Sequence, residues 1–389
     1  MEISEKANLK NFRKIKIKTK KARTPKKLET QKGNILIKIF RYLIIIISLF
    51  IIFFLLYWLI LKMVRKENIE ISQIFKKAIH ITNIGNNNNI LEPYIKAQKD
   101  FCDNPNKYLN QKYEDRLYLK KVKINDLNYQ IYTYNSNNAI TYSLNLRNAW
   151  EIDVSNNILE ALKFYVKEKS LSPKDVVMLD IGGCIGWYPS FLGRYNCTIL
   201  SFEAFEKNSY ASKKNYCLLN KDSNVIVITK GLGAKEETCS YFSHNGNEGN
   251  GMVICDKERI KNRTMVNIWA PEGEVQITTL NNFMPYLADK NIGLIKMDVE
   301  GHEVNVLKGG GNELITKYHV PFVVLEFAQD TFREVGSDYT ELAHLFVDNG
   351  YKITRKGFFS KEYITYDDLI TKVHGDVYFI HQSILEKIP

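Results

Sequence analysis

The chain is predicted to fold as an α/β domain with a mostly parallel, twisted sheet and helices on both faces, preceded by a single transmembrane helix. Three observations predict this. Short apolar strands alternate with helical stretches from about residue 157 to the end of the chain. The first strand of that series ends in an acid and then in closely spaced glycines. An uncharged apolar run of 20 residues lies upstream of the domain.

The amino-terminal residues hold all of the excess charge. Residues 1–41 contain 14 Lys and Arg and 3 acids, so they carry the whole net charge of +11, and the other 40 basic and 40 acidic residues balance. Residues 1–34 therefore form a basic tail, for which a nuclear-localisation signal is an alternative that the neighbouring apolar run argues against. Because the rest of the chain is neutral overall, nucleic acid is not expected as a partner.

The apolar run Tyr42–Leu61 predicts a membrane anchor. At about 1.5 Å per residue, a helix of this length spans roughly the 30 Å of a bilayer core. The run is too long and begins too late for a cleaved signal peptide, so residues 35–64 are expected to form a transmembrane signal-anchor helix. The excess of basic residues before it predicts a cytoplasmic amino terminus.

The remainder divides into a stem and a folded domain. Residues 65–120, with the asparagine run Asn86–Asn89, are expected to form a stem or linker, and residues 121–389 the domain, with its core over 172–389. All six cysteines follow the apolar run and no Cys-x-x-Cys pair occurs, so a zinc site is not expected. Disulfides are compatible with an oxidising compartment, but the sequence does not choose among their pairings.

The domain is expected to alternate strands and helices. In chain order, we expect a strand pair over Val122–Tyr134, a helix over Asn157–Lys169, strands over Val176–Leu179 and Thr198–Phe202, a helix over Lys207–Leu219, strands over Asn224–Thr229 and Gly293–Met297, a helix over His302–Tyr318, a strand over Pro321–Leu325, a helix over Tyr339–Asn349, and strands over Tyr351–Arg355 and Asp376–Ile380. Four acids end these strands, namely Asp180, Glu203, Asp298 and Glu326. In such sheets ligands bind beyond the carboxyl ends of the strands, so these acids are expected at a binding edge.

The loop after the first strand is typical of a nucleotide-type site. Gly182, Gly183 and Gly186 lack a Cβ, so the backbone can approach a ligand at the start of the next helix, although a tight turn without a ligand is the alternative. Glu203 follows Asp180 at the distance from which a second strand end reaches a ribose. NAD and S-adenosylmethionine both present that ribose. Asp180 would repel a pyrophosphate and suits a cationic sulfonium and ammonium, which favours S-adenosylmethionine.

Four motifs then indicate a family. They are AWEIDV with Trp150 and Glu151, DIGGCIGWYPSFLG, SFEAFEKN, and IKMDVEGHEVNVLKGG over Ile295–Gly310. With these motifs the chain resembles the FkbM family of S-adenosylmethionine-dependent methyltransferases from about Asn148 to its end, which implies a Rossmann-like methyltransferase fold. Two positions depart from the family pattern: Gly183-Cys184 replaces the usual Ala-Asn, and Asn281 stands where Asp is common. These departures keep a cofactor-weak or inactive variant as an alternative.

The resemblance implies roles for the strand-end residues. Asp180 and the glycines at 182, 183 and 186 would hold the methionine part of the donor, and Glu203 its ribose. Methyl transfer to a hydroxyl needs a general base or a metal ion. Asp298 is the first candidate for the base.

Three further candidates stand near Asp298, namely Glu300, His302 and Glu326. The carboxylates of Glu300 and Glu326 and the imidazole of His302 are suited either to act as a base or to hold a divalent metal ion, which is unproven. Each also has a structural alternative: a helix-dipole interaction for Glu300, a helix-cap contact for His302, and a pair with Lys296 for Glu326. The glycine-rich loop Ser243–Met252 is expected either to border the acceptor pocket or to be plain loop.

A basic tail, one anchor, a stem and a lumenal domain resemble the arrangement of Golgi glycan-modifying enzymes. We therefore expect a single-pass protein of a Golgi or other secretory-pathway membrane that methylates a sugar hydroxyl on a glycoprotein or glycolipid. Methylation of a small-molecule or lipid hydroxyl is the enzymatic alternative. Two different classes of protein also stay open: a degenerate domain that binds a glycan or partner without catalysis, and a nicotinamide oxidoreductase, against which Asp180 and the motif around Asp298 argue.

Overall fold

The computed structural model describes residues 90–388 apart from 136–137, 220–222, 245–246 and 263–268. The expected tail (1–34), the expected anchor (35–64) and the expected stem up to residue 89 lie outside the described residues. Within the described ranges, no helix combines the length and the apolar character that a bilayer crossing requires. The prediction of an anchor at Tyr42–Leu61 therefore stays a prediction.

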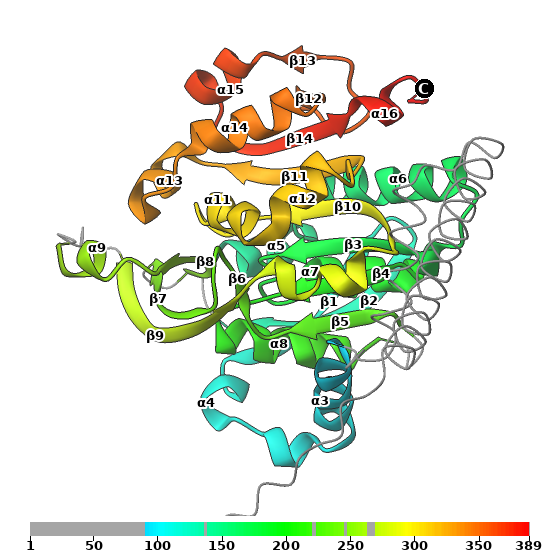
Figure 1. Ribbon diagram of the computed structural model, residues 1–389. Helices are drawn as coiled ribbons and strands as arrows, with labels where there is room; N and C mark the ends of the chain where they lie inside the picture. The colour runs from blue at the N-terminus through cyan, green and yellow to red at the C-terminus, as the bar shows by residue number, and fades with distance from the viewer. Residues whose placement is uncertain (1–89, 136–137, 220–222, 245–246, 263–268, 389) are drawn as a thin grey trace, which may run out of the picture. The chain divides into compact units, whose positions relative to one another are not determined.

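The centre of the domain is an eight-stranded sheet (Figure 1). In sheet order its strands are Tyr363–Ile364 (β13), Tyr351–Thr354 (β12), Gly375–His381 (β14), Phe322–Phe327 (β11), Asn291–Met297 (β10), Val176–Ile181 (β3), Thr198–Phe202 (β4) and Val225–Ile228 (β5). The neighbours from β11 to β5 pair in parallel, whereas β14 runs antiparallel to both β11 and β12, and β13 runs antiparallel to β12. The α/β fold is confirmed, and the sheet is mixed at one edge.

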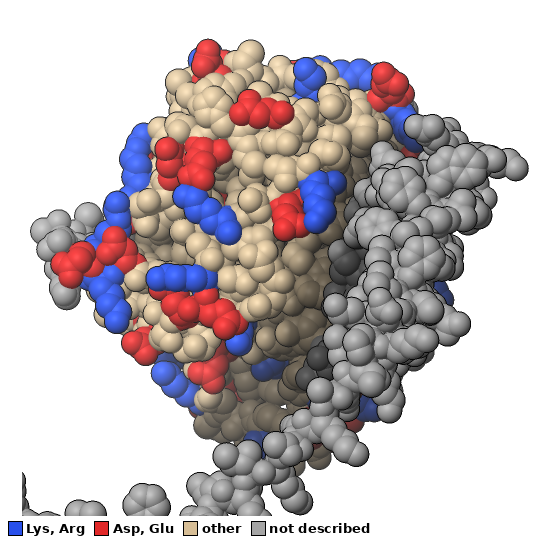
Figure 2. Space-filling model, viewed as in Figure 1, with Lys and Arg blue, Asp and Glu red and all other residues tan. Residues whose placement is uncertain are grey.

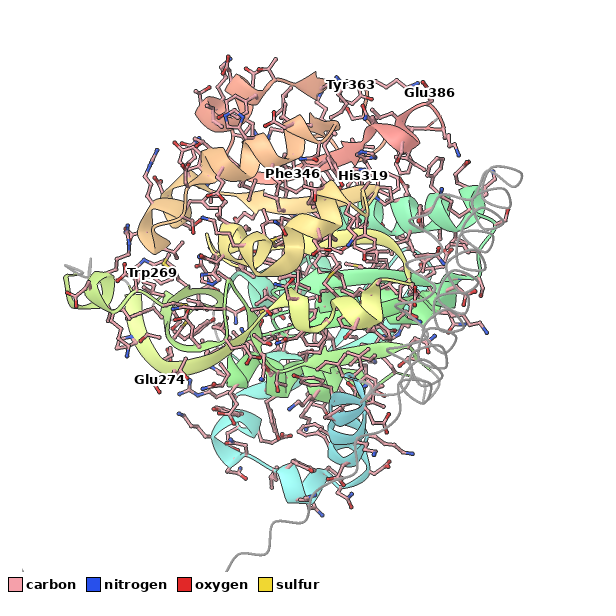
Figure 3. The ribbon with its side chains drawn as sticks, viewed as in Figure 1. Trp269, Glu274, His319, Phe346, Tyr363 and Glu386 are labelled. Atoms are coloured by element: carbon pink, nitrogen blue, oxygen red, sulfur yellow. A yellow bond between two sulfur atoms is a disulfide. The ribbon has the colours of Figure 1, made fainter. Side chains whose placement is uncertain are left out.

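Helices cover both faces of this sheet. In chain order, the α-helices of the described residues are α3 (Glu92–Asp103), α4 (Gln111–Glu114), α5 (Ala139–Arg147), α6 (Ile152–Glu168), α7 (Trp187–Leu192), α8 (Glu206–Tyr216), α9 (Lys257–Asn262), α10 (Met284–Leu287), α11 (Glu303–Val306), α12 (Asn312–Thr316), α13 (Gln329–Val335), α14 (Tyr339–Asp348), α15 (Tyr366–Lys372) and α16 (Gln382–Leu385). Alternate residues of β3 enter two different apolar cores, because successive side chains of a strand point to opposite faces. Leu179 belongs to the core that contains Phe346 of α14, and Met178 to the core that contains α6 and α7. Phe346 stacks on Phe379 of β14 with ring centroids 4.1 Å apart (Figure 3).

Charged side chains of both signs are interspersed on the face shown in Figure 2. Several form exposed pairs, such as Lys308 with Glu341 at 2.8 Å and Lys317 with Glu313 at 3.0 Å. Exposed pairs of this kind contribute at most about 1 kcal/mol each, so the fold does not depend on them. This mixture of signs agrees with the even count of acids and bases beyond residue 41.

The prediction of a single helix over His302–Tyr318 is wrong, because a turn interrupts this segment. Residues Leu307–Gly311 form a π-helical turn between α11 and α12, and Gly310 takes a φ of +119°. A Cβ at Gly310 would lie 2.7 Å from the backbone nitrogen of Asn281, and one at Gly309 only 1.9 Å from the backbone oxygen of Gly233. The glycines therefore let this turn pack directly against other backbone segments.

A second sheet interrupts the expected alternation of strands and helices. Its strands are arranged in the order β6 (Gly231–Leu232), β9 (Trp269–Thr278), β7 (Glu237–His244) and β8 (Asn247–Ile254). The loop expected over Ser243–Met252 is mostly strand β8, which forms a hairpin with β7. Asparagine and glycine are poor strand formers, so only the pairing with β7 makes this segment extended. A disulfide between Cys239 and Cys255 joins the two strands of this hairpin region.

The described part of the expected stem packs on the domain. Helix α3 lies beside the edge strand β5, where Gln98 Nε2 donates to the oxygen of Val225 at 2.8 Å and Gln98 Oε1 accepts from the nitrogen of Val227 at 2.9 Å. A second disulfide joins Cys102 of α3 to Cys217. The amide of Gln98 thus replaces a neighbouring strand at an edge that would otherwise expose free backbone groups. The expected strand pair is confirmed as the hairpin of β1 (Leu117–Ile124) and β2 (Leu127–Tyr134).

The Gln98→Ala variant is expected to unfold more easily. It leaves a buried carbonyl and a buried N–H of β5 without partners, which costs about 1–3 kcal/mol for each group left unsatisfied. Urea unfolding followed by circular dichroism measures the difference. Lys99→Ala, at an exposed position of the same helix, controls for the change to alanine. Equal stabilities of the two variants would show that Gln98 does not protect the sheet edge.

Candidate active site

Backbone hydrogen bonds hold the carboxyl ends of three neighbouring strands together. The oxygen of Phe202, at the end of β4, accepts from the nitrogens of Gly182 at 3.0 Å and Gly183 at 2.9 Å. The nitrogen of Asp298, after β10, donates to the oxygen of Ile181 at 2.9 Å. The loop that follows β3 is therefore fixed between β4 and β10. The acids that follow β4 and β10 stand on opposite sides of this loop.

Two of the glycines are required by close approach. Gly182 has a φ of +86°, and a Cβ there would lie 1.8 Å from the backbone oxygen of Asp298. A Cβ at Gly183 would lie 2.1 Å from Ser201 Oγ. Gly186 has a different role, because its missing Cβ makes room for Ser212 of α8, 2.6 Å away. The first two glycines shape the binding edge, and the third lets α7 pack on α8.

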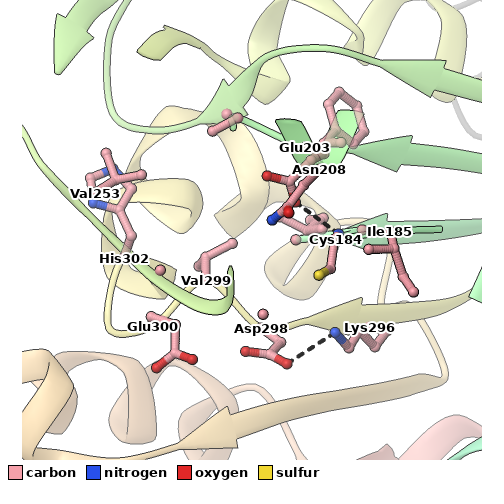
Figure 4. A pocket seen from close by; sticks show the side chains of 18 of the residues that line it. Cys184, Ile185, Glu203, Asn208, Val253, Lys296, Asp298, Val299, Glu300 and His302 are labelled. Atoms are coloured by element: carbon pink, nitrogen blue, oxygen red, sulfur yellow. Dashed lines mark hydrogen bonds and ion pairs between the residues drawn. The ribbon is translucent and has the colours of Figure 1, made fainter. Parts of the chain in front are cut away.

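An open hollow lies at these strand ends (Figure 4). Of the residues expected in the site, those that line it are Gly182, Gly183, Glu203, Asp298, Glu300 and His302. Those outside its lining are Asp180, Gly186 and Glu326. The hollow thus joins the expected ribose-binding acid with most of the expected catalytic residues.

Asp180 supports the loop from below. Its side chain is completely buried, Oδ2 accepts from Ser201 Oγ at 2.7 Å, and no donor among the described residues reaches Oδ1. Burial raises the pKa of Asp180, while the ammonium of Lys296 opposes that rise. A Cβ placed on Gly183 would come within 3.1 Å of the Asp180 carboxylate, so the loop lies directly on it. The expectation that Asp180 itself holds the donor therefore has no support in the lining of the hollow.

Glu203 faces the hollow from the end of β4. One carboxylate oxygen accepts from the nitrogen of Cys184 and the other from the nitrogen of Phe205, both at 2.8 Å. Burial raises the pKa of Glu203 to about 7, while these hydrogen bonds oppose the rise. The side chain of Asn208 also donates to this carboxylate, and because its two oxygens offer about four lone pairs, one is left for a ligand hydroxyl. The loop and the acid are thus joined into one unit that is suited to a ribose.

A cluster of carboxylates forms the opposite side. Asp298, Glu300 and Glu326 each place one carboxylate oxygen within 4.8 Å of the others. Burial raises the pKa of Glu300 and of Glu326, and the charge of Asp298 adds to the rise in both. Lys296 Nζ lies 3.1 Å from Asp298 Oδ2. Among the described residues, Lys296 therefore forms its ion pair with Asp298 and not with Glu326, the partner expected for it.

His302 lines a different part of the hollow from this cluster. In Figure 4 its ring lies beside Val253, whereas Asp298 and Lys296 lie together elsewhere. Only 5% of His302 is exposed, and burial lowers the pKa of its imidazole to about 4, so the ring is neutral at physiological pH. Its Nδ1 lies 3.3 Å from the side-chain nitrogen of Asn305, one turn further along the chain. His302 directly precedes α11 but makes no side-chain hydrogen bond that caps it, so the structure does not support a helix-cap contact as its alternative role.

Several lining residues were absent from the expected site. The hairpin of β7 and β8 contributes Tyr241, Gly249 and Gly251, so this segment borders the hollow, as one of the two interpretations of the sequence expected. Tyr241 stacks on Phe205 with ring centroids 4.2 Å apart. No local pattern marks Tyr241, because it reaches the site through the pairing of β7 with β9. Glu151 also lines the hollow, and its only signal in the sequence was the Trp-Glu pair.

The two departures from the family pattern differ in position. Cys184 lines the hollow, and its backbone nitrogen provides the bond to Glu203 that any residue except proline can provide. Asn281 does not line the hollow and lies instead against Gly310. The backbone contact of residue 184 with Glu203 is thus kept with cysteine at this position.

Comparison with known proteins connects part of this domain with a known family. Residues 180–353 match the family described as the methyltransferase FkbM domain. A relative named Methyltransferase 1, from Beauveria bassiana (strain ARSEF 2860), is 28% identical over 152 residues. That match covers 36% of this chain and 61% of the relative.

Solved structures share only parts of the arrangement. Monomeric WbdD is 12% identical, with a TM-score of 0.34 over 62% of this chain and 44% of WbdD. The magnesium protoporphyrin IX methyltransferase ChlM from Synechocystis PCC 6803, with bound SAH, is 11% identical, with a TM-score of 0.27 over 59% of this chain and 84% of ChlM.

The Gly182→Ala variant is expected to lose more stability than Gly273→Ala. Both positions have a positive φ, +86° and +125°, so alanine is strained at each. Only at Gly182 does the new Cβ also meet backbone, since nothing lies within 4 Å of a Cβ at Gly273. Forcing Asp298 away from the loop is expected to add about 2 kcal/mol or more to the cost. Chemical denaturation of both variants checks this, and equal losses would contradict the tight contact between loop and β10.

Proposed function

We propose that this protein is an S-adenosylmethionine-dependent O-methyltransferase that acts on a sugar hydroxyl of a glycoprotein or glycolipid. One observation carries the proposal. Within an FkbM domain, a single hollow joins a glycine loop and Glu203 on one side with the carboxylates of Asp298 and Glu300 on the other. The first side suits the nucleoside of a methyl donor, and the second suits a hydroxyl that must lose its proton.

The residues of the hollow fit this donor better than they fit a dinucleotide. Glu203, Asp298, Glu300 and Glu151 bring four carboxylates to the lining, with Lys296 as the only Lys or Arg among the lining residues. A pyrophosphate would face this negative charge unfavourably, whereas a donor with sulfonium and ammonium groups is attracted to it. When bound, S-adenosylmethionine supplies an electrophilic methyl group on its sulfonium sulfur.

The chain itself must then activate the acceptor. A sugar hydroxyl is a weak nucleophile until its proton leaves, so a base must lie close to it. Asp298 suits this role because it follows β10 directly and is oriented by Lys296 at 3.1 Å. Glu300 and Glu326 stand close enough to Asp298 either to share the proton or to hold a divalent cation with it.

The compartment and the acceptor are also part of the proposal. We place the domain on the lumenal side of a Golgi or other secretory membrane, with the amino terminus in the cytoplasm. The disulfides Cys102–Cys217 and Cys239–Cys255 support this, since disulfides persist in oxidising compartments. The basic residues before the apolar run support the same orientation. A small-molecule or lipid hydroxyl is the alternative acceptor, and a domain that binds a glycan or partner without catalysis is the non-enzymatic alternative.

The full-length protein is expected to bind S-adenosylhomocysteine, the demethylated product, and not NAD. In Glu203→Gln the ribose loses a charged acceptor, so the affinity for S-adenosylhomocysteine is expected to fall about tenfold. Isothermal titration calorimetry measures both ligands. Glu206→Gln, three residues further along and exposed, is the matched control and should bind as the native protein does. Binding of NAD alone would overturn the proposal, and binding of neither ligand would favour a degenerate domain.

The carboxylate cluster is expected to bind Mn²⁺ if a metal takes part in the reaction. Electron paramagnetic resonance of free Mn²⁺ would then show binding that Asp298→Asn and Glu326→Gln remove and that the exposed control Glu386→Gln retains. Because protons compete at Glu326, whose pKa burial raises, the affinity should increase from about pH 6 to about pH 8. No binding at either pH, with turnover unchanged by EDTA, would leave Asp298 as a base without a metal.

A further inference from the structure

Glu151 is a carboxylate of the hollow to which no role has been assigned. It directly precedes α6, takes a φ of +41°, and lines the hollow. The hydroxyl of Tyr188, on α7, donates a hydrogen bond to its Oε2. A largely buried carboxylate loses the solvation of its charge, so its retention at a ligand-facing position needs an explanation.

Glu151 lies on the β10 side of the glycine loop. The charges that act on it most strongly are those of Lys296 and Asp298, which come from the end of β10. Glu203 follows β4, and β3 stands between β4 and β10 in the sheet. Glu203 and Glu151 therefore lie on different sides of the glycine loop. If the ribose of a ligand binds Glu203, only a part of that ligand that extends across this loop reaches Glu151.

The charges on this side do not balance. Lys296 is close to three carboxylates, those of Asp298, Asp180 and Glu151, which together outweigh the effect of burial and raise the pKa of its ammonium. Lys296 forms its ion pair with Asp298. Asp180 lies beneath the loop and outside the lining. Of these three carboxylates, Glu151 is thus the one that faces the hollow without a cation paired to it in the described structure.

We propose that Glu151 binds the ammonium group at the amino-acid end of the methyl donor. This inference rests on the proposed function and deepens it. It transfers to Glu151 the contact that the sequence suggested for Asp180, which does not line the hollow. The amino-acid end is the part of the donor that extends from the ribose across the loop, and its ammonium is the charge that this side of the hollow lacks.

The chemistry of the carboxylate supports this assignment. Burial raises the pKa of Glu151 to about 7, and the charges of Asp298 and Asp376 act in the same direction, whereas Lys296 and the bond from Tyr188 oppose it. A cation beside the carboxylate would replace the lost solvation and favour its charged form. An ammonium group held by a carboxylate forms a charge-assisted hydrogen bond, which is stronger than a neutral one.

Two ligands separate this contact from the rest of the site. S-adenosylhomocysteine carries the amino-acid end, whereas 5′-methylthioadenosine has the same adenosine and sulfur without it. Calorimetric titration of the full-length protein with both ligands should show that Glu151→Gln weakens binding of S-adenosylhomocysteine about tenfold or more. Binding of 5′-methylthioadenosine should change by less than about twofold, because that ligand has no group for Glu151 to bind.

Two further variants complete the test. Glu160→Gln makes the same substitution at an exposed position of α6, and it should leave both affinities unchanged. Glu151→Asp keeps the charge but withdraws it by one methylene, and it should also weaken S-adenosylhomocysteine selectively. Thermal unfolding shows whether each variant is folded. If the glutamine variant does not fold, the selective loss of affinity can still be measured with Glu151→Asp.

The opposite results are equally clear. An unchanged affinity of Glu151→Gln for S-adenosylhomocysteine would overturn the inference and would assign Glu151 to the acceptor instead. Equal weakening of both ligands would overturn it as well, because the effect would then be a distortion of the whole site. If the native protein binds neither ligand, the proposed function fails and the inference fails with it. If the proposed function holds, Glu203→Gln should lower the affinity for both ligands, because both contain the ribose.

Discussion

The site depends on the backbone hydrogen bonds that join the ends of β3, β4 and β10. The oxygen of Phe202 accepts from two successive glycines of the loop, and Ile181 accepts from Asp298. These bonds place the acids after β4 and β10 on either side of one loop. They require a loop without Cβ atoms, since a Cβ at Gly182 would lie 1.8 Å from the oxygen of Asp298. The spacing of the acids is thus set by the backbone, which is stiffer than side chains at a surface.

The lining of the hollow is electrostatically unfavourable without a ligand. Glu151, Glu203 and Glu300 all have pKa values that burial raises, and Lys296 is the only Lys or Arg in the lining. Buried carboxylates near one another destabilise a folded protein unless a cation or a proton compensates them. This concentration of charge at the carboxyl edge of the sheet is typical of a binding site rather than of a stabilising network. The same charge is the reason for which we propose a cationic methyl donor rather than a dinucleotide.

Much of the sheet and part of the site were predictable from local patterns. Short apolar strands that end in acids indicated β3, β4, β10 and β11. Glu203 and Asp298 directly follow β4 and β10, whereas Asp180 and Glu326 are the second-last residues of β3 and β11. The roles of individual residues were less predictable. Asp180 and Gly186 match the pattern as well as Glu203 does, yet neither lines the hollow. Glu151 and Tyr241 line it without a strong pattern, because helix packing and the pairing of β7 with β9 bring them there.

The sequence by itself determined most of the alternation of strands and helices, the glycine loop and an acid at or next to the carboxyl end of β3, β4, β10 and β11, because these features can be read from hydrophobic periodicity and from the positions of the acids and glycines. It also determined where the excess positive charge lies. Only the tertiary structure decided which acids face the hollow, which cysteines pair, and that residues 92–103 pack on the edge of the sheet. These features depend on contacts between residues far apart in the chain, such as Gln98 with Val225 and Cys102 with Cys217, and no local pattern encodes such distances.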